Sequence, residues 1–526
     1  MDKIKLMLFI ILITGVAFIA YSWYLSYPLS IDSLNDFVFN GICIYYWFGL
    51  SLTLATMFVM TVTLKSHYSK WIITISLVIT MYSLSYFYYM LPGSDSHYFR
   101  GLTEYFIETR DLDPTIRGHY YFQWPVFFLL SDIATSVIGI HLPSFEFLLY
   151  TIIGFLFATT LYVYASRRLE NGGFLAVVTF FIMMFYFLNY QCVPFSLAFA
   201  FLLLMVMLET KQKSFAITLT TLLLFFGTSL LHAFVPLFFI LYLLTRFILD
   251  RSGLYTRLFI LFLTIYLVIQ ITQAQYSFEQ NIRAAISLTP EYLGIFEAAQ
   301  APASVPIDVI AQLFSRFVTI TTIIICFIGF IILLIKRKLG NLDKAIFLTG
   351  VFYSAVGTIL YALGSRAIPL AFIPISLGAS YFLQSKVRKL ITFLSLIMLI
   401  LFTFIPLHSS FYDSQIMFQT EEAYRMENFM IDRYNWTRPD LILAHVRVIT
   451  YLRAKQPSNV KFKNDVSDPL FPRIKEYDSI VYTIGLGKNL LKHNYITERI
   501  LKEEEFSVIY SNGYSYIAIR NRNFAD

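Results

Sequence analysis

Charged residues are scarce in this sequence of 526 residues. Asp, Glu, Lys and Arg together make up 14% of the chain, whereas soluble globular proteins carry roughly 25%. The mean hydropathy is +0.65. This shortage of charge excludes an ordinary soluble protein over most of the chain, and only about the last quarter has a usual composition.

Cysteine is also rare, and the chain contains only Cys43, Cys192 and Cys326. Their spacing fits neither a disulfide framework nor a metal site, so we expect them to be packing residues. The sequence has no P-loop, no Rossmann fingerprint, no cluster of histidines for a metal and no serine-hydrolase elbow. It also shows no internal repeat, which argues against a transporter.

Long apolar runs are abundant, and about 20 apolar residues span a bilayer as a helix. The first run follows Lys3 and Lys5 and has no nearby cleavage site, so we interpret it as an uncleaved helix and not a signal peptide. The fold class that we predict is a polytopic α-helical membrane protein with about 13 crossings. The predicted crossings are 4–28, 41–64, 71–91, 147–166, 172–189, 192–209, 214–230, 232–249, 257–275, 313–335, 344–363, 367–384 and 389–406.

The positive-inside rule orients these crossings. With a cytoplasmic N-terminus, basic loops such as 65–70 and 386–389 fall in the cytoplasm. This agreement holds only if the apolar segment 125–141, which contains Asp132, does not cross. We therefore interpret 125–141 as a re-entrant or interfacial helix. The net charge of +7 then belongs to short loops between helices and is no sign of nucleic-acid binding.

The chain divides into a transmembrane domain, 1–406, and a tail, 407–526, that we expect outside the cell. Residues 420–435 predict an amphipathic helix and 477–484 a strand. Residues 506–520 predict a hairpin around Asn512-Gly513. The tail is therefore predicted to be a small extracytoplasmic α/β domain. The expected location of the whole protein is the cell membrane.

The first large outside loop, 92–125, gathers residues suited to chemistry. Asp95, His97 and Arg100 follow a predicted crossing closely, and residues 98–110 predict an amphipathic surface helix. Tyr121 and Trp124 lie in an aromatic stretch before Pro125. A carboxylate at the membrane–water boundary can act as a general base or bind a divalent metal. The alternative is that these charges are simply solvated in the loop.

Several segments resemble the GT-C glycosyltransferase superfamily. They are GSDSH at 93–97, YYFQWPVFFLL at 120–130, NYQCVPF at 189–195 and TSLLHAF at 228–234. The last two are similar to archaeal members of that group. The resemblance implies transfer of a sugar from a polyprenyl-phosphate-linked donor on the outer face of the membrane. The acceptor would be a glycan, a lipid or a protein.

The resemblance assigns the role of catalytic carboxylate to Asp95, with His97 beside it. The family often has a second acidic residue nearby, where this chain has Ser96 or His97, and Glu104 or Asp111 remain alternatives for that carboxylate. A metal cofactor, Mg²⁺ or Mn²⁺, is therefore left open at Asp95. Arg100, Glu104, Tyr121 and Trp124 are the candidates for residues that contact the acceptor or belong only to the loop.

The donor phosphate needs cationic partners, and an arginine fork suits phosphate well. The candidates are His232, Arg366 and Arg316, which lie at the predicted outer ends of helices. Snorkelling to lipid headgroups is the alternative for the two arginines. A second long outside loop, 276–312, would cover the donor or the acceptor.

Two other function classes stay open from the sequence. A polysaccharide polymerase or ligase also has many helices and uses polyprenyl-linked sugars, although its large loop generally lies later in the chain. A transporter or a structural membrane protein would need no catalytic carboxylate. Loss of function on substitution of Asp95 would separate an enzyme from these last two.

Overall fold

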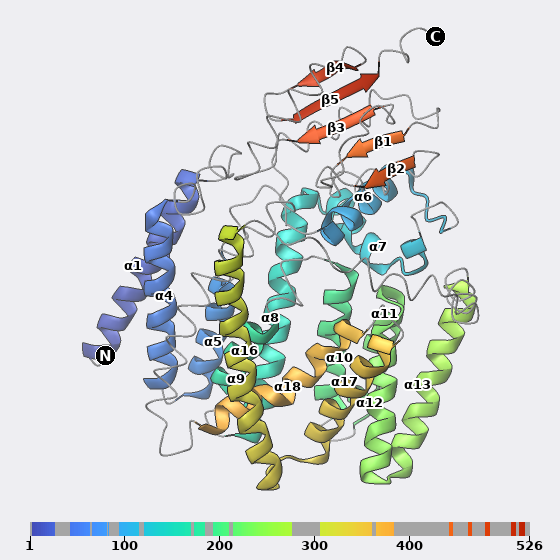
Figure 1. Cartoon of the computed structure of the whole chain (residues 1–526). Helices are drawn as coiled ribbons and strands as arrows, with labels where there is room; N and C mark the ends of the chain where they lie inside the picture. Colours follow the sequence, from blue (N-terminus) through green and yellow to red (C-terminus); the bar gives the residue numbers. More distant parts are fainter. Residues whose placement is uncertain are drawn as a thin grey trace.

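The structure is a computed structural model, and it describes a bundle of helices and a small sheet (Figure 1). The backbone is described for residues 3–26, 43–63, 66–81, 83, 94–114, 120–169, 173–184, 193–209, 214–275, 306–359 and 364–382, and for five strands between 441 and 520. All statements below concern these residues.

Helices account for most of the described chain. Their bounds are α1 (Lys3–Ser26), α4 (Ile44–Thr63), α5 (His67–Met81), α6 (Ser94–Thr109), α7 (Val126–Asp132), α8 (Leu142–Arg168), α9 (Gly173–Met184), α10 (Pro194–Glu209), α11 (Phe215–Leu231), α12 (Val235–Asp250), α13 (Gly253–Thr272), α16 (Pro306–Ile335), α17 (Asn341–Ile359) and α18 (Gly364–Phe382). A 3₁₀ turn, η2 (Tyr120–Gln123), precedes α7, and a π-helical turn, η3 (Ile133–Val137), follows it.

Every predicted crossing except 389–406 overlaps one of these helices, and 389–406 lies outside the described residues. Within the described part of the chain, four segments are long and apolar enough to cross a membrane: Leu6–Ser26, Ile44–Thr61, Leu142–Arg168 and Gly253–Thr272. The protein is therefore a helical protein with several segments able to span a bilayer. The total number of crossings stays a prediction.

The segment from Val126 to Val137 is too short to cross. At 1.5 Å per residue, α7 and η3 together extend about 18 Å, whereas a bilayer core is about 30 Å thick. Figure 1 shows α6 and α7 together at one end of the bundle, from which α8 runs back through it. This arrangement supports the interpretation of 125–141 as a segment that does not cross.

Close contact between backbones brings α16 and α18 together at two glycines. A Cβ atom added to Gly378 would lie 1.9 Å from the carbonyl oxygen of Cys326, and one added to Gly329 would lie 2.3 Å from that of Gly378. Small residues let membrane helices approach this closely, because nothing separates the two main chains. Cys326 is buried at this contact, as expected of a packing residue.

Buried polar groups join α8 to α17 near the C-terminal end of α8. Tyr164 donates a hydrogen bond of 2.7 Å to Asp343, and Arg168 forms an ion pair of 3.2 Å with the same carboxylate. The Gly340 N–H donates a hydrogen bond of 2.8 Å to the second carboxylate oxygen of Asp343. Asp343 is fully buried, and these partners compensate the loss of its water.

Five strands of the tail form one mixed sheet. They are β1 (Leu441–Ala444), β2 (Lys461–Asn464), β3 (Ser479–Thr483), β4 (Phe506–Ser511) and β5 (Ser515–Arg520), in the order β2-β1-β3-β5-β4. β1 is parallel to β2 and to β3, and β5 is antiparallel to β3 and to β4.

The sequence predictions for the tail agree with this sheet at two places. β3 lies within the predicted strand 477–484, and β4 and β5 lie within the predicted hairpin 506–520. The predicted turn Asn512-Gly513 and the predicted helix 420–435 fall outside the described residues. The tail as a separate α/β domain therefore stays a prediction.

Candidate functional site

Helix α6 forms because its apolar residues recur with a helical period. Phe99, Leu102 and Phe106 lie on one side of it and are buried, as the amphipathic pattern predicts. Glu104 is half-buried and Glu108 is exposed. Asp95 and His97 lie in the first two turns of α6, and their side chains are outside what the structure describes.

The positions of Glu104 and Asp111 argue against both of them as a second carboxylate that shares a metal ion with Asp95. Glu104 lies on the opposite face of the helix from Asp95, about 14 Å along its axis. Asp111 follows the end of α6, about 24 Å from Asp95. Ligands of one metal ion lie about 2 to 2.6 Å from it, so neither residue can share an ion with Asp95 in this arrangement.

Arg100 lies on α6 and is buried, and its predicted role towards the acceptor stays a prediction. Its side chain forms a bidentate ion pair with Glu146 of α8, and its Nε lies 3.1 Å from each carboxylate oxygen. The exposed fraction of Arg100 is 1%. The position on α6 turns this residue towards α8, and the pair joins the two helices.

Tyr121 and Trp124 connect α6 to the rest of the site. The centre of the Tyr121 ring lies 4.7 Å from the centre of the Phe99 ring and 5.9 Å from the centre of the Trp124 ring. Trp124 is buried and packs with Ala233 and Ala274. The two aromatic residues therefore form a continuous contact from α6 to the turn between α11 and α12.

His232 ends α11 and is buried among aromatic rings. Its ring lies 5.4 Å from the ring of Phe195, at the start of α10. Its Nδ1 accepts a hydrogen bond of 3.2 Å from the Phe234 N–H, so the ring can donate through Nε2. Tyr266 of α13 donates to the carbonyl oxygen of Ala233 at 3.0 Å and holds the turn.

These contacts bring three predicted site residues, Tyr121, Trp124 and His232, to one place. We call this place the η2 junction. It is formed by η2, the α11–α12 turn and the end of α13, and it is joined to α6 through Phe99. Arg316 lies on α16 and Arg366 in the first turn of α18. The side chains of both arginines lie outside the described residues. Of the predicted loop 276–312, residues 276–305 also lie outside them, and residues 306–312 are the start of helix α16, which corrects the end of that loop.

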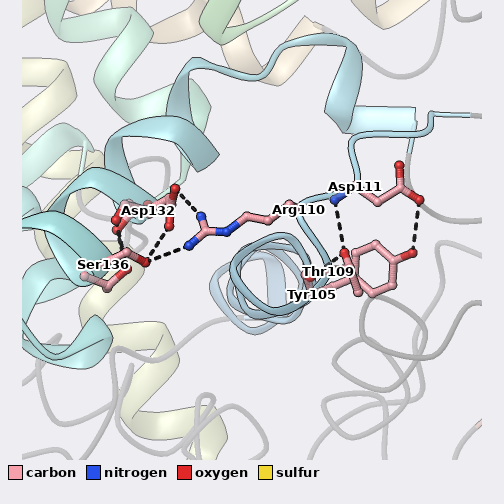
Figure 2. A network of polar contacts seen from close by, with 8 residues as sticks. Tyr105, Thr109, Arg110, Asp111, Asp132 and Ser136 are labelled. Carbon is pink, nitrogen blue, oxygen red and sulfur yellow. Dashed lines mark hydrogen bonds and ion pairs between the residues drawn. The ribbon is translucent and has the colours of Figure 1, made fainter.

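A polar network that the sequence analysis missed fixes the far end of α6 (Figure 2). Arg110 forms an ion pair with Asp132 and donates to Ser136 at 3.1 Å, while Ser136 donates to Asp132 at 2.6 Å. The hydrogen bond from Arg110 lowers the pKa of Asp132 below its usual value. We call these three residues the Arg110 latch.

Asp111 takes part in a separate set of hydrogen bonds beside the latch, which Figure 2 also shows. It accepts from the Asp113 N–H at 3.0 Å and from the Tyr105 hydroxyl at 3.5 Å. These are the bonds of a local turn, and they hold the chain where it leaves α6. Asp111 is thus engaged at the end of α6 that is remote from Asp95.

The missed residues share one sequence signal. Glu146 and Asp132 are acidic residues inside apolar stretches, where an ionisable side chain needs a partner.

Among the described residues, no three His, Cys, Asp or Glu side chains lie together as a set of metal ligands.

Comparison with known proteins adds no family. No protein-family model matches the chain, and no curated protein matches it with significant similarity. The arguments for function therefore depend on the residues themselves and on the short GT-C-like segments.

Proposed function

We propose that this protein is a GT-C-type glycosyltransferase that moves a sugar from a polyprenyl-phosphate-linked donor to an acceptor on the outer face of the cell membrane. The observation that supports this most is the meeting of GT-C-like segments. Residues of the 120–130 segment contact the 228–234 segment through Trp124 and Ala233, and the 93–97 segment begins the helix that packs on Tyr121.

The proposed topology has about 13 crossings, a cytoplasmic N-terminus and an extracytoplasmic α/β domain. Its support is that α6, α7 and the sheet lie at the same end of the bundle in Figure 1. The turn between α12 and α13 lies at the opposite end and carries Arg251 and Arg257 in or next to it, as a cytoplasmic turn would.

The proposed reaction uses Asp95 as a general base. Its carboxylate takes the proton of an acceptor hydroxyl, the hydroxyl oxygen forms a bond to the anomeric carbon, and the bond from that carbon to the phosphate oxygen breaks. The phosphate leaves with its charge on the lipid. His232, Arg366 and Arg316 are the proposed partners of that charge. His97 lies within one turn of Asp95 and is the proposed second residue of the catalytic segment.

The test is turnover of polyprenyl-phosphate sugars by the purified protein in lipid. Asp95→Asn removes the base and is expected to lower the rate about 10²- to 10⁴-fold. Glu108→Gln is the matched control, because Glu108 is exposed in the last turn of the same helix. It should leave the rate nearly unchanged.

Two results would contradict the proposal in different ways. Equal turnover by wild type and Asp95→Asn would keep the enzyme and remove Asp95 from the chemistry. No turnover with any donor, from protein that is folded, would favour a polymerase, a transporter or a binding role.

A further inference from the structure

Two buried hydrogen-bond donors in and beside the η2 junction have no partner among the described residues. The indole Nε1 of Trp124 and the amide Nε2 of Gln270 are both shielded from solvent and make no hydrogen bond to the part of the chain that the structure describes. Each side chain is 3% exposed. Buried polar groups are nearly always paired, so each such donor requires an explanation.

Gln270 and Trp124 face the same place. Tyr266 and Gln270 are four residues apart on α13 and therefore lie on one side of the helix, and Ala274 follows two residues after its end. Tyr266 donates to Ala233, and Ala274 packs with Ala233 and Trp124. Gln270 lies one turn after Tyr266 on this side of α13, so we place its side chain at the junction beside Trp124.

Aromatic rings line the junction. Tyr121 and Phe234 pack beside Trp124, and His232 lies in the same turn as Phe234. The indole N–H can only donate a hydrogen bond, and the Gln270 nitrogen is also a donor. A group bound here must therefore offer oxygen acceptors and a face that packs on aromatic rings.

We propose that Trp124 and Gln270 form a subsite that binds the hydroxyl oxygens of the sugar carried by the donor. This inference depends on the proposed function and adds residues for the sugar. A pyranose ring offers several oxygen acceptors and apolar C–H faces, and it carries no charge. The phosphate is assigned to His232, at the same junction, and to Arg366 and Arg316, because it needs cations and Trp124 and Gln270 supply none.

The variants separate the hydrogen bond from the shape of the side chain. Trp124→Phe removes the indole N–H and keeps an aromatic ring, and Gln270→Met removes the amide and keeps the length. Trp71→Phe is the matched control for the first, because the Trp71 Nε1 on α5 is also buried without a partner. Gln273→Met is the control for the second, because Gln273 is exposed one turn further along.

The measurement is equilibrium binding to protein in lipid nanodiscs by titration calorimetry. The probes are polyprenyl-phosphate glucose, mannose and galactose, polyprenyl phosphate without sugar, and the free sugars. For the sugar-linked lipid that wild type binds, Trp124→Phe and Gln270→Met should each raise Kd about three- to tenfold. The two controls should leave Kd unchanged, and the sugar-free lipid should bind all five proteins alike.

Each other outcome has a definite meaning. An equal loss with sugar-free polyprenyl phosphate would overturn the sugar assignment, since the donors would then face the phosphate. Unchanged binding in both variants, or no binding of any probe to wild type, would overturn the subsite. Binding of free sugar that depends on Trp124 and Gln270, without binding of any lipid-linked sugar, would keep the subsite and reject the proposed donor.

Discussion

Arg100 and Glu146 are the most deeply buried ion pair that joins α6 to the bundle. Both side chains are almost completely removed from solvent, with exposed fractions of 0% and 8%. Removing two ions from water costs several kcal/mol for each, and only good geometry offsets that cost. The bidentate contact supplies this geometry, and it anchors the helix whose first turns carry Asp95 and His97.

Breaking this pair on one side should destabilise the protein strongly. Arg100→Met leaves the Glu146 carboxylate buried and uncompensated, so we expect the free energy of unfolding to fall by about 3 to 5 kcal/mol. The double variant Arg100→Met/Glu146→Met removes both charges and should recover most of that loss. The measurement is reversible unfolding of the protein in lipid. Equal losses in the single and double variants would show that the ion pair is not the cause.

Sequence reasoning predicts some of the candidate site residues and could not predict others, for a physical reason. Trp124 and His232 are recognisable, because each stands in a short segment with a clear local pattern. The role of Arg100 is not recognisable locally, since its partner Glu146 is 46 residues away. Gln270 shows its importance only when the face of α13 is known to meet Trp124.

At the scale of elements, α6 is held at both of its ends by different means. The Arg100 pair holds its first half, and the Arg110 latch holds its last turn against α7 and η3. Arg110 has a left-handed backbone with φ of 60°, and it lies just after the end of the helix. The latch is partly exposed, so it should respond to pH and salt, whereas the buried pair should not.

The latch should open in acid. Because the pKa of Asp132 is lowered in the folded protein, the stabilising contribution is complete above the usual value of about 3.9. It is lost as the pH falls through the lowered value. Spin labels on Glu108→Cys and Val137→Cys, which are exposed positions, should show a longer distance once the pH has fallen through that lowered pKa.

Asp132→Asn supplies the control for this experiment. It should lack the acid step and should show the longer distance, or a broader distribution of distances, at neutral pH as well. A distance that stays constant with pH in both proteins would mean that the latch does not hold α6 in place.

The sequence predicts most elements well where one physical signal dominates. Apolar runs predict the membrane helices, and the period of Phe99, Leu102 and Phe106 predicts α6. The segment 125–141 is harder, because its composition fits a crossing and only the charge of the later loops argues otherwise. The structure adds the length of the helix, since α7 passes into a π-helical turn that ends at Val137. Whether the segment crosses stays a prediction.

At the scale of the whole molecule, that short segment decides the side on which every later loop lies. If Val126 to Val137 does not cross, the end of α6 and the start of α8 share one side of the membrane. The turn between α12 and α13 then lies on the other side. The placement of the proposed site on the outer face therefore depends on whether this segment crosses the membrane.

Labelling of single cysteines tests directly on which side of the membrane these segments lie. With the three natural cysteines replaced by alanine, we expect Glu108→Cys and His141→Cys to react with an impermeant maleimide on intact cells. Arg251→Cys should react only after the membrane is permeabilised. All three positions are exposed. Reaction of Glu108→Cys and His141→Cys from opposite sides would show that the short segment crosses, and the outer-face site would then be wrong.

The contact of α16 with α18 has a mechanical consequence. At Gly378 and Gly329 the two main chains touch directly, so a larger side chain at either position would push the helices apart. Helix α16 carries Arg316 and α18 carries Arg366, so such a substitution would change the spacing of the two helices that carry the proposed phosphate-binding arginines.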